Sequence, residues 1–279
     1  MIIDAHTHIF SPHVIEQREQ YCSSDGCFRL LYSKPNSKMC SAEELILAMD
    51  SREISRSVIQ NIGWESHEMC MRSNDYILES IAKYPHRLIG FCSIQPLAGE
   101  KALAELERCY KGGVQGVGEL RPDVQGFDLC DINLMNPIVN HMIKRGLLLS
   151  LHASEPVGHQ YPGKGTMVPG ILCRFIQAHQ ELEVILAHLG GGLPFYELIP
   201  EVKDILSNTY YDTAATPFLY SSDVYSALTR IVSLKKIIFG SDYPLLDPIR
   251  VSDHIKSAGL SNIELDNILY NNSAKIFGC

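Results

Sequence analysis

The sequence lacks several features that mark particular classes of protein. No apolar run approaches the roughly 20 residues that a membrane-spanning helix needs, and the N-terminus has no basic segment followed by an apolar one, as a secretory signal has. The nine cysteines form no CxxC pair, which argues against a disulfide framework or a zinc ribbon. We therefore expect a cytoplasmic protein with reduced thiols and no membrane association.

Basic residues are also scarce. The chain has 24 lysines and arginines against 32 acidic residues, a formal net charge of −8, and no basic cluster. Because an acidic surface repels a phosphate backbone, we expect no nucleic-acid partner. What is present is a chain of 279 residues with 46% hydrophobic content, a length typical of one α/β barrel.

Short apolar runs rich in Val, Ile and Leu recur along the whole chain, each followed by a longer stretch of helical character. Runs that are apolar on both faces and alternate with helices indicate parallel strands joined by crossover helices, and eight such units close a barrel. The predicted fold is an α/β protein, a (β/α)8 or TIM barrel, with residues 1–279 as a single domain. The strands are expected at residues 1–6, 56–61, 88–93, 114–119, 147–152, 183–188, 209–213 and 236–241.

Helix boundaries are visible as well. Ser41 and Glu44 fit a capping box. Pro137 is expected to open a helix that closes at Gly146. Residues 10–40 and 153–170 are too long and too rich in polar residues, Gly and Pro for simple turns, and both follow strand ends, where the active-site loops of barrels lie.

Polar side chains end several of the predicted strands at one rim of the barrel. His6 and His8 stand two residues apart on a strand, so both imidazoles project to the same side. Corresponding positions hold Glu119, His152, His188 and Asp242. Barrel interiors are normally filled by branched apolar side chains, so such a set is costly unless its members pair or bind an ion. The pattern predicts a metal site.

The motifs DAHTH (4–8), LHASE (151–155), AHLGG (187–191) and GSDYP (240–244) occur in an order that resembles the amidohydrolase superfamily, specifically its amidohydrolase-2, decarboxylase-related branch. YPHRLIGFCSIQP (84–96), YYDTAATP (210–217) and NNSAKIFG (271–278) extend the resemblance over nearly the whole chain. It implies that the metal ligands are His6, His8, His152 and Asp242. His188 would be either a ligand of a second metal or an acid/base and carbonyl-polarising group.

Nitrogen and carboxylate ligands without a thiolate suit Zn²⁺, Mn²⁺ or Fe²⁺, and zinc is the first expectation. Some binuclear relatives carry a bridging carbamylated lysine near the position of Glu119, and others carry a glutamate there. We therefore expect Glu119 to bridge two cations ~3.5–4 Å apart, although a single-metal site would need no such bridge.

Hydrolysis of a C–N or C–O bond in a small amide, lactam, lactone or ester is the main functional expectation. Water on the metal would be the nucleophile, Asp242 would take and return its proton, and His188 or a second metal would stabilise the oxyanion. The alternative is nonoxidative decarboxylation of an unsaturated or aromatic acid, with Arg121, Lys164 or Arg174 holding a carboxylate. A phosphoesterase of the TatD type ranks third.

Substrate selection is expected to lie in the loops around the mouth of the barrel. The small-molecule substrate would meet an aromatic wall at Trp64 and polar groups after the fourth, fifth and eighth strands. Relatives of this type are often dimers, and exposed outer helices are compatible with a homodimer. The candidate substrate-binding residues are Trp64, Arg121, His159, Tyr161, Lys164 and Tyr243.

Overall fold

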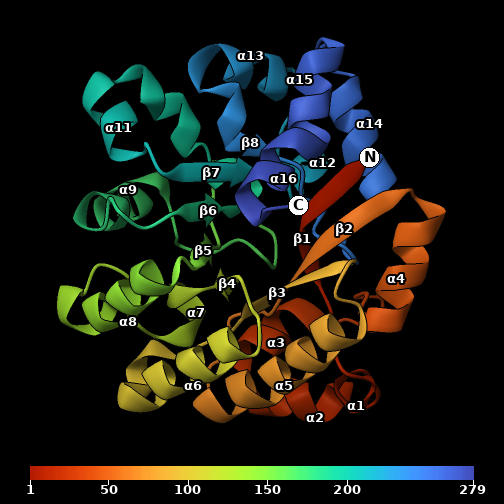
Figure 1. The fold of residues 1–279 in the computed structure, drawn as a ribbon, viewed down its shortest axis with the longest axis vertical. Coiled ribbons are helices and arrows are strands. Elements are labelled where there is room, and N and C mark those ends of the chain that lie inside the picture. The colour runs from red at the N-terminus through yellow and green to blue at the C-terminus, as the bar shows by residue number, and fades with distance from the viewer.

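A computed structural model describes all 279 residues, and its eight parallel strands follow one another in chain order around a nearly closed barrel (Figure 1). The first and last strands meet through hydrogen bonds from Ala5 N to Phe239 O and from His8 N to Tyr243 O, each 2.8 Å. The strands are β1 (Ile2–His8), β2 (Ile54–Gln60), β3 (Leu88–Cys92), β4 (Gly116–Leu120), β5 (Leu148–Leu151), β6 (Val184–Leu186), β7 (Thr209–Asp212) and β8 (Ile237–Ile238). The expected barrel and its eight strands are confirmed.

Strand β8 is shorter than the sequence predicted. Its expected last residues leave the backbone ladder because side chains take over their amides: Gly240 N donates to Thr213 Oγ1 at 3.0 Å, and Ser241 N donates to Asp4 Oδ1 at 2.9 Å. Asp4 lies on β1, so this contact joins the first strand to the end of the last.

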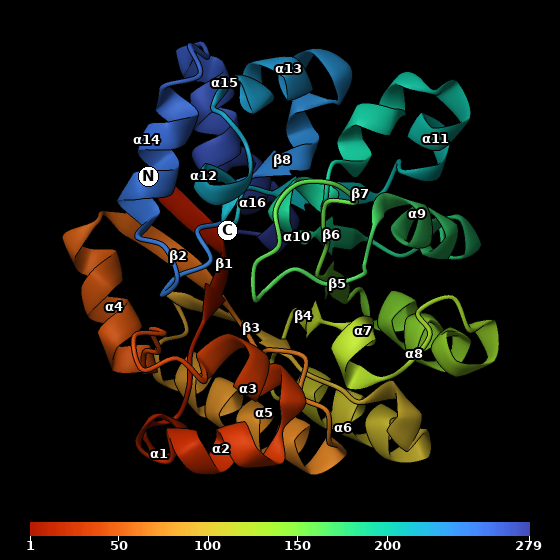
Figure 2. The same cartoon turned by 180° about the vertical axis from the view of Figure 1, so that it is seen from behind.

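Helices lie around the outside of the barrel (Figure 2). In α5, Cys70, Asn74, Ile77 and Ile81 are buried at spacings of four, three and four residues, the pattern of one helical face against the barrel. No helix combines the length and the apolar character needed to traverse a membrane.

The longer helices are α4 (Ala42–Ser51), α5 (His67–Lys83), α6 (Glu100–Lys111), α8 (Ile132–Arg145), α9 (Pro169–Ala178), α13 (Asp223–Ile231) and α14 (Pro248–Lys256). The shorter ones are α1 (Pro12–Glu16), α2 (Arg18–Ser24), α3 (Gly26–Tyr32), α7 (Pro122–Gln125), α10 (Ala187–Gly190), α11 (Pro200–Ile205), α12 (Thr216–Leu219), α15 (Asn262–Asp266) and α16 (Asn272–Phe277).

The three predicted helix boundaries have different outcomes. Ser41 and Glu44 form the expected capping box. Pro137, however, lies inside α8 and does not open it, because Asp131 caps the helix earlier by accepting hydrogen bonds from Asn133 N and Leu134 N. Gly146 ends α8 in the left-handed conformation, as expected.

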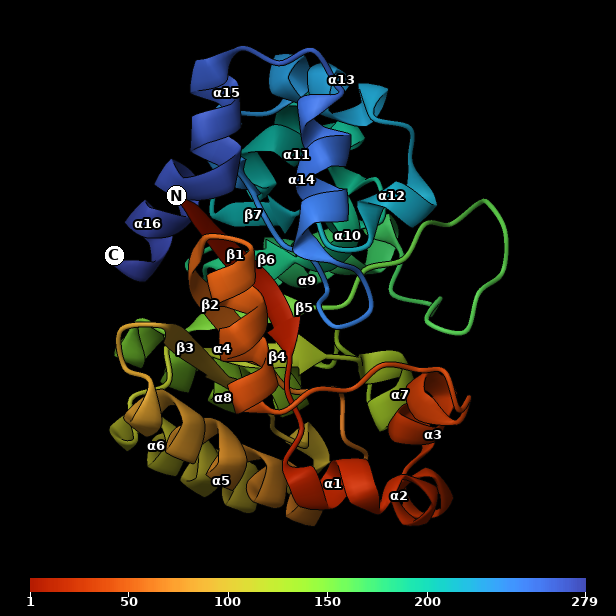
Figure 3. The same cartoon turned by 90° about the vertical axis from the view of Figure 1, so that its right-hand side faces the viewer.

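The two long connections at the rim are built differently. Residues 11–40, which we call the cap, fold into α1, α2 and α3, and residues 153–168, which we call the strap, contain no helix or strand. Figure 3 shows α3 and the green strap on the same side of the molecule, beside α7 and α12. Both connections therefore border the carboxyl ends of the strands, where the polar residues collect.

Candidate metal centre and pocket

One of the two histidines of β1, His6, is oriented by a carboxylate from β7. Asp212, the last residue of β7, lies with Oδ2 2.8 Å from His6 Nδ1. A carboxylate only accepts, so His6 Nδ1 donates to Asp212, and His6 Nε2 is the ring nitrogen that faces the centre. That atom is 3.0 Å from His8 Nε2, and such carboxylate–histidine pairs orient metal ligands in many proteins.

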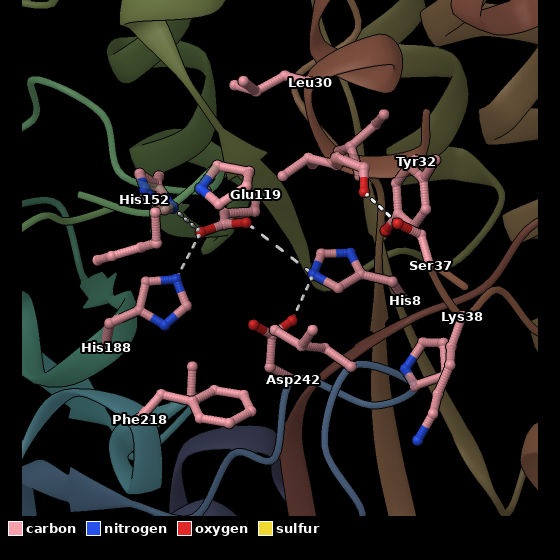
Figure 4. Close-up of a pocket in the computed structure, with 18 of the residues that line it drawn as sticks. His8, Leu30, Tyr32, Ser37, Lys38, Glu119, His152, His188, Phe218 and Asp242 are labelled. Carbon is pink, nitrogen blue, oxygen red and sulfur yellow. Dashed lines mark hydrogen bonds and ion pairs between the residues drawn. The ribbon is translucent and has the colours of Figure 1, made fainter. Parts of the chain in front are cut away.

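Glu119 lies between two pairs of histidines, of which Figure 4 labels His8, His152 and His188. Its Oε2 is 3.9 Å from the Nε2 atoms of both His6 and His8. Its Oε1 is 2.9 Å from His152 Nδ1 and 3.6 Å from His188 Nε2. Each carboxylate oxygen therefore faces one pair, which is the geometry expected of a group shared by two neighbouring cation sites.

Asp242 and His188 reach the centre from strained backbone. Their φ angles are 65° and 56°, in the left-handed region that residues other than glycine rarely adopt and that is enriched at functional sites. Asp242 Oδ1 is 3.4 Å from His8 Nε2. His188 N donates to Asp212 Oδ1 and His188 Nδ1 donates to Ala214 O, each at 3.0 Å, so His188 Nε2 faces the centre.

Burial and mutual charge shift the pKa values of these groups in opposite directions. Burial raises the pKa of Asp242, but the hydrogen bond to His8 and the charge of His6 outweigh it and hold the pKa at about 2. Burial lowers the pKa of His6, yet the Asp212 carboxylate raises it to about 10. Against the same burial, Glu119 raises the pKa of His188 to about 9. The carboxylates are thus anionic and attract cations to the centre.

The donor set fits a divalent metal. One group is His6, His8 and Glu119, the other is Glu119, His152 and His188, and within each the ligand atoms lie within 4.8 Å of one another. All donors are imidazole nitrogens or carboxylate oxygens, a set that suits Zn²⁺ and Mn²⁺. The facing ring nitrogens of His6 and His8, 3.0 Å apart, require a proton or a cation between them.

A cavity of about 440 Å³ opens onto this centre. Leu30 and Tyr32 of α3 and Phe218 of α12 contribute apolar walls, and Ser37 and Lys38 lie farther along the cap (Figure 4). Three of the predicted substrate-binding residues also line the cavity: Arg121, His159 and Tyr161. Its size falls within the range of small-molecule sites, roughly 300–1,000 Å³.

Three predicted substrate-binding residues lie elsewhere. Trp64 is 0% exposed and stacks on Phe28 at 5.5 Å, because the cap supplies aromatic side chains that cover it. Lys164 donates to Val157 O and His159 O, and so ties the strap to itself. Tyr243 lines a separate depression on the other side of Pro244. Arg174, a candidate carboxylate binder, is exposed on α9.

Sequence reasoning missed Asp212, which orients both His6 and His188. The signal was available, because Asp212 lies near the end of the seventh predicted strand (209–213), as the metal-site candidates do in theirs. It also missed Asp4, whose Oδ2 accepts from Ser241 Oγ at 2.5 Å and whose pKa burial raises to about 7. The apolar walls from α3 were missed because no helix was expected in the cap.

The barrel, the donor set and the cavity together define a TIM-barrel enzyme with a metal-binding site. The chain belongs to the amidohydrolase family, whose model matches residues 3–279. This confirms the family resemblance deduced from the motifs.

Relatives with named activities extend this result. The chain is 24% identical to 2-amino-3-carboxymuconate-6-semialdehyde decarboxylase of Dictyostelium discoideum, covering 99% of this chain and 91% of that protein. The structure of 5-carboxyvanillate decarboxylase from Sphingomonas paucimobilis matches with a TM-score of 0.81 at 15% identity, covering 99% and 98% of the two chains. A dihydroxybenzoic acid decarboxylase from Polaromonas sp. JS666, solved with bound manganese and the inhibitor 2-nitroresorcinol, matches with a TM-score of 0.73 at 18% identity, covering 99% and 96%.

The expectation of hydrolysis was wrong. These relatives are decarboxylases, which agrees with the alternative prediction and gives no support to a phosphoesterase. The error has a chemical reason: a cation with an aspartate beside it can activate water for hydrolysis or assist proton transfer to carbon. The ligand pattern alone therefore does not select the reaction.

Proposed function

We propose that this protein is a metal-dependent nonoxidative decarboxylase of a small aromatic or unsaturated carboxylic acid. The similarity to the Dictyostelium decarboxylase over 99% of the chain carries the proposal. The cavity supports it, since its walls combine apolar and aromatic side chains with a few convergent polar groups, as sites for small aromatic molecules do.

His6, His8 and Asp242 would hold a divalent cation, with Glu119, His152 and His188 completing one site or forming a second. Bound there, the cation would supply positive charge that orients the acid and stabilises developing negative charge. Zn²⁺ suits these donors, and the manganese bound by the Polaromonas relative makes Mn²⁺ the second candidate.

In the reaction the bond between the carboxylate carbon and the substrate carbon breaks, CO₂ leaves, and the electron pair stays on the substrate carbon. A proton then forms the new C–H bond. Asp242 is proposed to take this proton from water and pass it to the substrate carbon, because it lines the cavity and lies 3.4 Å from His8. If a single cation leaves His188 unliganded, its Nε2 would hold a proton near a substrate oxygen, since Ala214 O occupies its other nitrogen.

The apolar walls favour this chemistry. A carboxylate between Leu30, Tyr32 and Phe218 loses water contacts, whereas neutral CO₂ needs none. Because charge leaves the carboxylate and spreads over the substrate, a poorly solvated pocket disfavours the starting anion more than the transition state.

Release of CO₂ from 2,6-dihydroxybenzoate and 5-carboxyvanillate tests the proposal directly. The protein, purified without chelator, is incubated with each acid in D₂O, and the product is examined by mass spectrometry. We expect CO₂ and one deuterium on the ring carbon. Asp242→Asn should lower the rate about 10²- to 10⁴-fold. Asp253→Asn, which neutralises an exposed aspartate on α14, should not change it. No CO₂ from either acid or from a wider panel of unsaturated acids would refute the proposal.

Metal content tests the proposed ligands separately. Elemental mass spectrometry gives metal per chain for the purified protein, for His6→Ala and for Glu119→Gln. Two equivalents that fall to one in Glu119→Gln would support a shared carboxylate, as the two faces of Glu119 suggest. One equivalent that is indifferent to Glu119 but lost in His6→Ala would support a single ion, and no metal at all would refute both.

A further inference from the structure

Arg121 is a buried cation in the wall of the cavity with a fixed position. It directly follows β4, is 1% exposed, and lines the same cavity as Glu119 and His152. Its backbone N–H donates to Gln125 Oε1 at 3.0 Å, and Gln125 Nε2 in turn donates to Trp64 O and Ile94 O. These hydrogen bonds fix the backbone from which the Arg121 side chain extends into the cavity wall.

The guanidinium has few partners of its own. It carries five N–H bonds, of which Nη2 donates to Gly163 O at 3.0 Å. The one carboxylate near it is that of Asp123, whose Oδ2 lies 3.8 Å from Nη2, beyond hydrogen-bond distance. Its Nε is buried and has no partner. A buried cation so poorly matched by acceptors is unfavourable unless a ligand completes its shell.

The strap covers one side of this group and explains why Asp123 does not complete the shell. Thr166 N donates to Asp123 Oδ2 at 3.0 Å, so this oxygen holds the strap. A side chain at Gly165 would place a Cβ 3.0 Å from Arg121 Nη2 and in collision with Asp123 Oδ2. The strap thus occupies part of the Nη2 side. Nη1 donates to no group of the protein, so Nη1 and the second N–H of Nη2 are the donors left for a ligand in the cavity.

We propose that Arg121 binds a second acidic group of the substrate, one that is not lost as CO₂. This inference rests on the proposed decarboxylation and narrows its substrate class to aromatic or unsaturated diacids. Arginine matches a carboxylate with two parallel hydrogen bonds, and buried arginine does so strongly.

The leaving carboxylate is a poor partner for Arg121. Its charge disappears as CO₂ forms, so a cation held against it stabilises the starting state more than the transition state and slows the reaction. A second carboxylate keeps its charge throughout, so binding it anchors the substrate without this penalty. The metal centre and Arg121 would then hold opposite parts of one diacid.

Binding of inert probes tests the inference without turnover. Benzoate, phthalate, isophthalate and terephthalate are titrated calorimetrically into the metal-bearing protein. We expect at least one diacid to bind 10-fold or more tightly than benzoate. Arg121→Gln should lower the binding affinity for that diacid by about 10- to 100-fold and change the affinity for benzoate less than about threefold. Arg121→Lys, which keeps the charge without the planar fork, should fall between. Lys101→Gln removes an exposed charge on α6, away from the cavity, and should leave the preference intact.

Several outcomes would overturn the inference: no diacid preference in the unmodified protein, or a preference that survives in Arg121→Gln. If that variant does not fold, a crystal structure of the unmodified protein with the tightest diacid decides, because the second carboxylate must lie within hydrogen-bond distance of Arg121. An Arg121-dependent preference without CO₂ release from any acid would refute the proposed reaction alone. CO₂ release without the preference would refute this inference alone.

Discussion

The cap and the strap border the same cavity but are held in place by different forces. In the cap, Phe28 is fully buried and packs against Phe10, Tyr32 and Trp64, with ring centroids between 4.9 and 6.4 Å apart in this aromatic group. The strap has no comparable core. It is held by single hydrogen bonds, within itself from Gly165 N to Ser154 Oγ at 2.9 Å and from Tyr161 OH to Glu155 Oε2 at 3.0 Å, and to α7 from Thr166 N to Asp123 Oδ2 at 3.0 Å.

This difference indicates which wall of the cavity can move. Burying several aromatic side chains contributes many kcal/mol and couples the cap to the whole fold, whereas each strap hydrogen bond contributes only about 1 kcal/mol. Segments with few buried apolar contacts open locally at low free energy. We therefore expect the strap, which covers Arg121, to open for ligand entry while the cap stays closed.

Phe28→Ala should produce the largest effect, because it removes the centre of the cap's aromatic cluster. Truncating a buried phenylalanine lowers the free energy of unfolding by about 3–5 kcal/mol. Urea denaturation followed by circular dichroism measures the loss. Leu30→Ala is the control on the same helix, since Leu30 is 39% exposed, and it should change stability by less than about 1 kcal/mol. Equal effects from the two variants would show that the cap is not part of the cooperative core.

The sequence predicted what depends on local periodicity. Apolar runs identified all eight strands, and strand alternation correctly predicted that His6 and His8 face one point. Because parallel strands end at one rim, the same reasoning also brought Glu119 and Asp242 to the centre. These inferences need only the direction of the chain and the alternation of side chains along a strand, both of which can be deduced from the sequence.

The rest depended on packing between distant segments. Trp64 was wrongly expected at the mouth of the barrel. It is buried against Phe28 of the cap helices, and the composition of residues 10–40 did not predict those helices. Asp212 contacts His6 only after the barrel closes, 206 residues apart in sequence. Pro137 was misassigned because Asp131, whose side chain accepts hydrogen bonds from the first helical amides, is the N-cap residue of α8 and starts the helix before Pro137.

Gly165→Ala should loosen the strap without affecting the cap. The new Cβ would press on Arg121 Nη2 and Asp123 Oδ2, and crowding of this kind costs about 1–3 kcal/mol. Amide hydrogen exchange of residues 157–168, followed by mass spectrometry, should become roughly 10- to 100-fold faster. The free energy of global unfolding should change little. Gly170→Ala is the matched control, because a Cβ there meets nothing within 4 Å. Exchange as slow as in the unmodified protein would show that the strap already has room.

Tyr161→Phe should have the smallest effect, since it removes one hydrogen bond from the strap. The loss of the contact with Glu155 corresponds to about 0.5–1.5 kcal/mol, so tryptic cleavage after Lys164 should become about 2- to 10-fold faster. Tyr210→Phe removes the same kind of contact, to Glu183 at 2.8 Å, outside the strap and should leave cleavage unchanged.

The pH dependence of this effect follows from the tyrosine itself. Burial, with the nearby Glu155 carboxylate, raises the pKa of the Tyr161 hydroxyl above its usual value of 10.0. An acid whose folded pKa is raised contributes its full stability below the unfolded pKa and loses it as the pH rises above that value. The ratio of cleavage rates between Tyr161→Phe and the unmodified protein should therefore be constant from about pH 7 to about pH 9. A ratio that falls to one within that range would mean that the hydroxyl has lost its proton and that the strap is more open to water than its contacts imply.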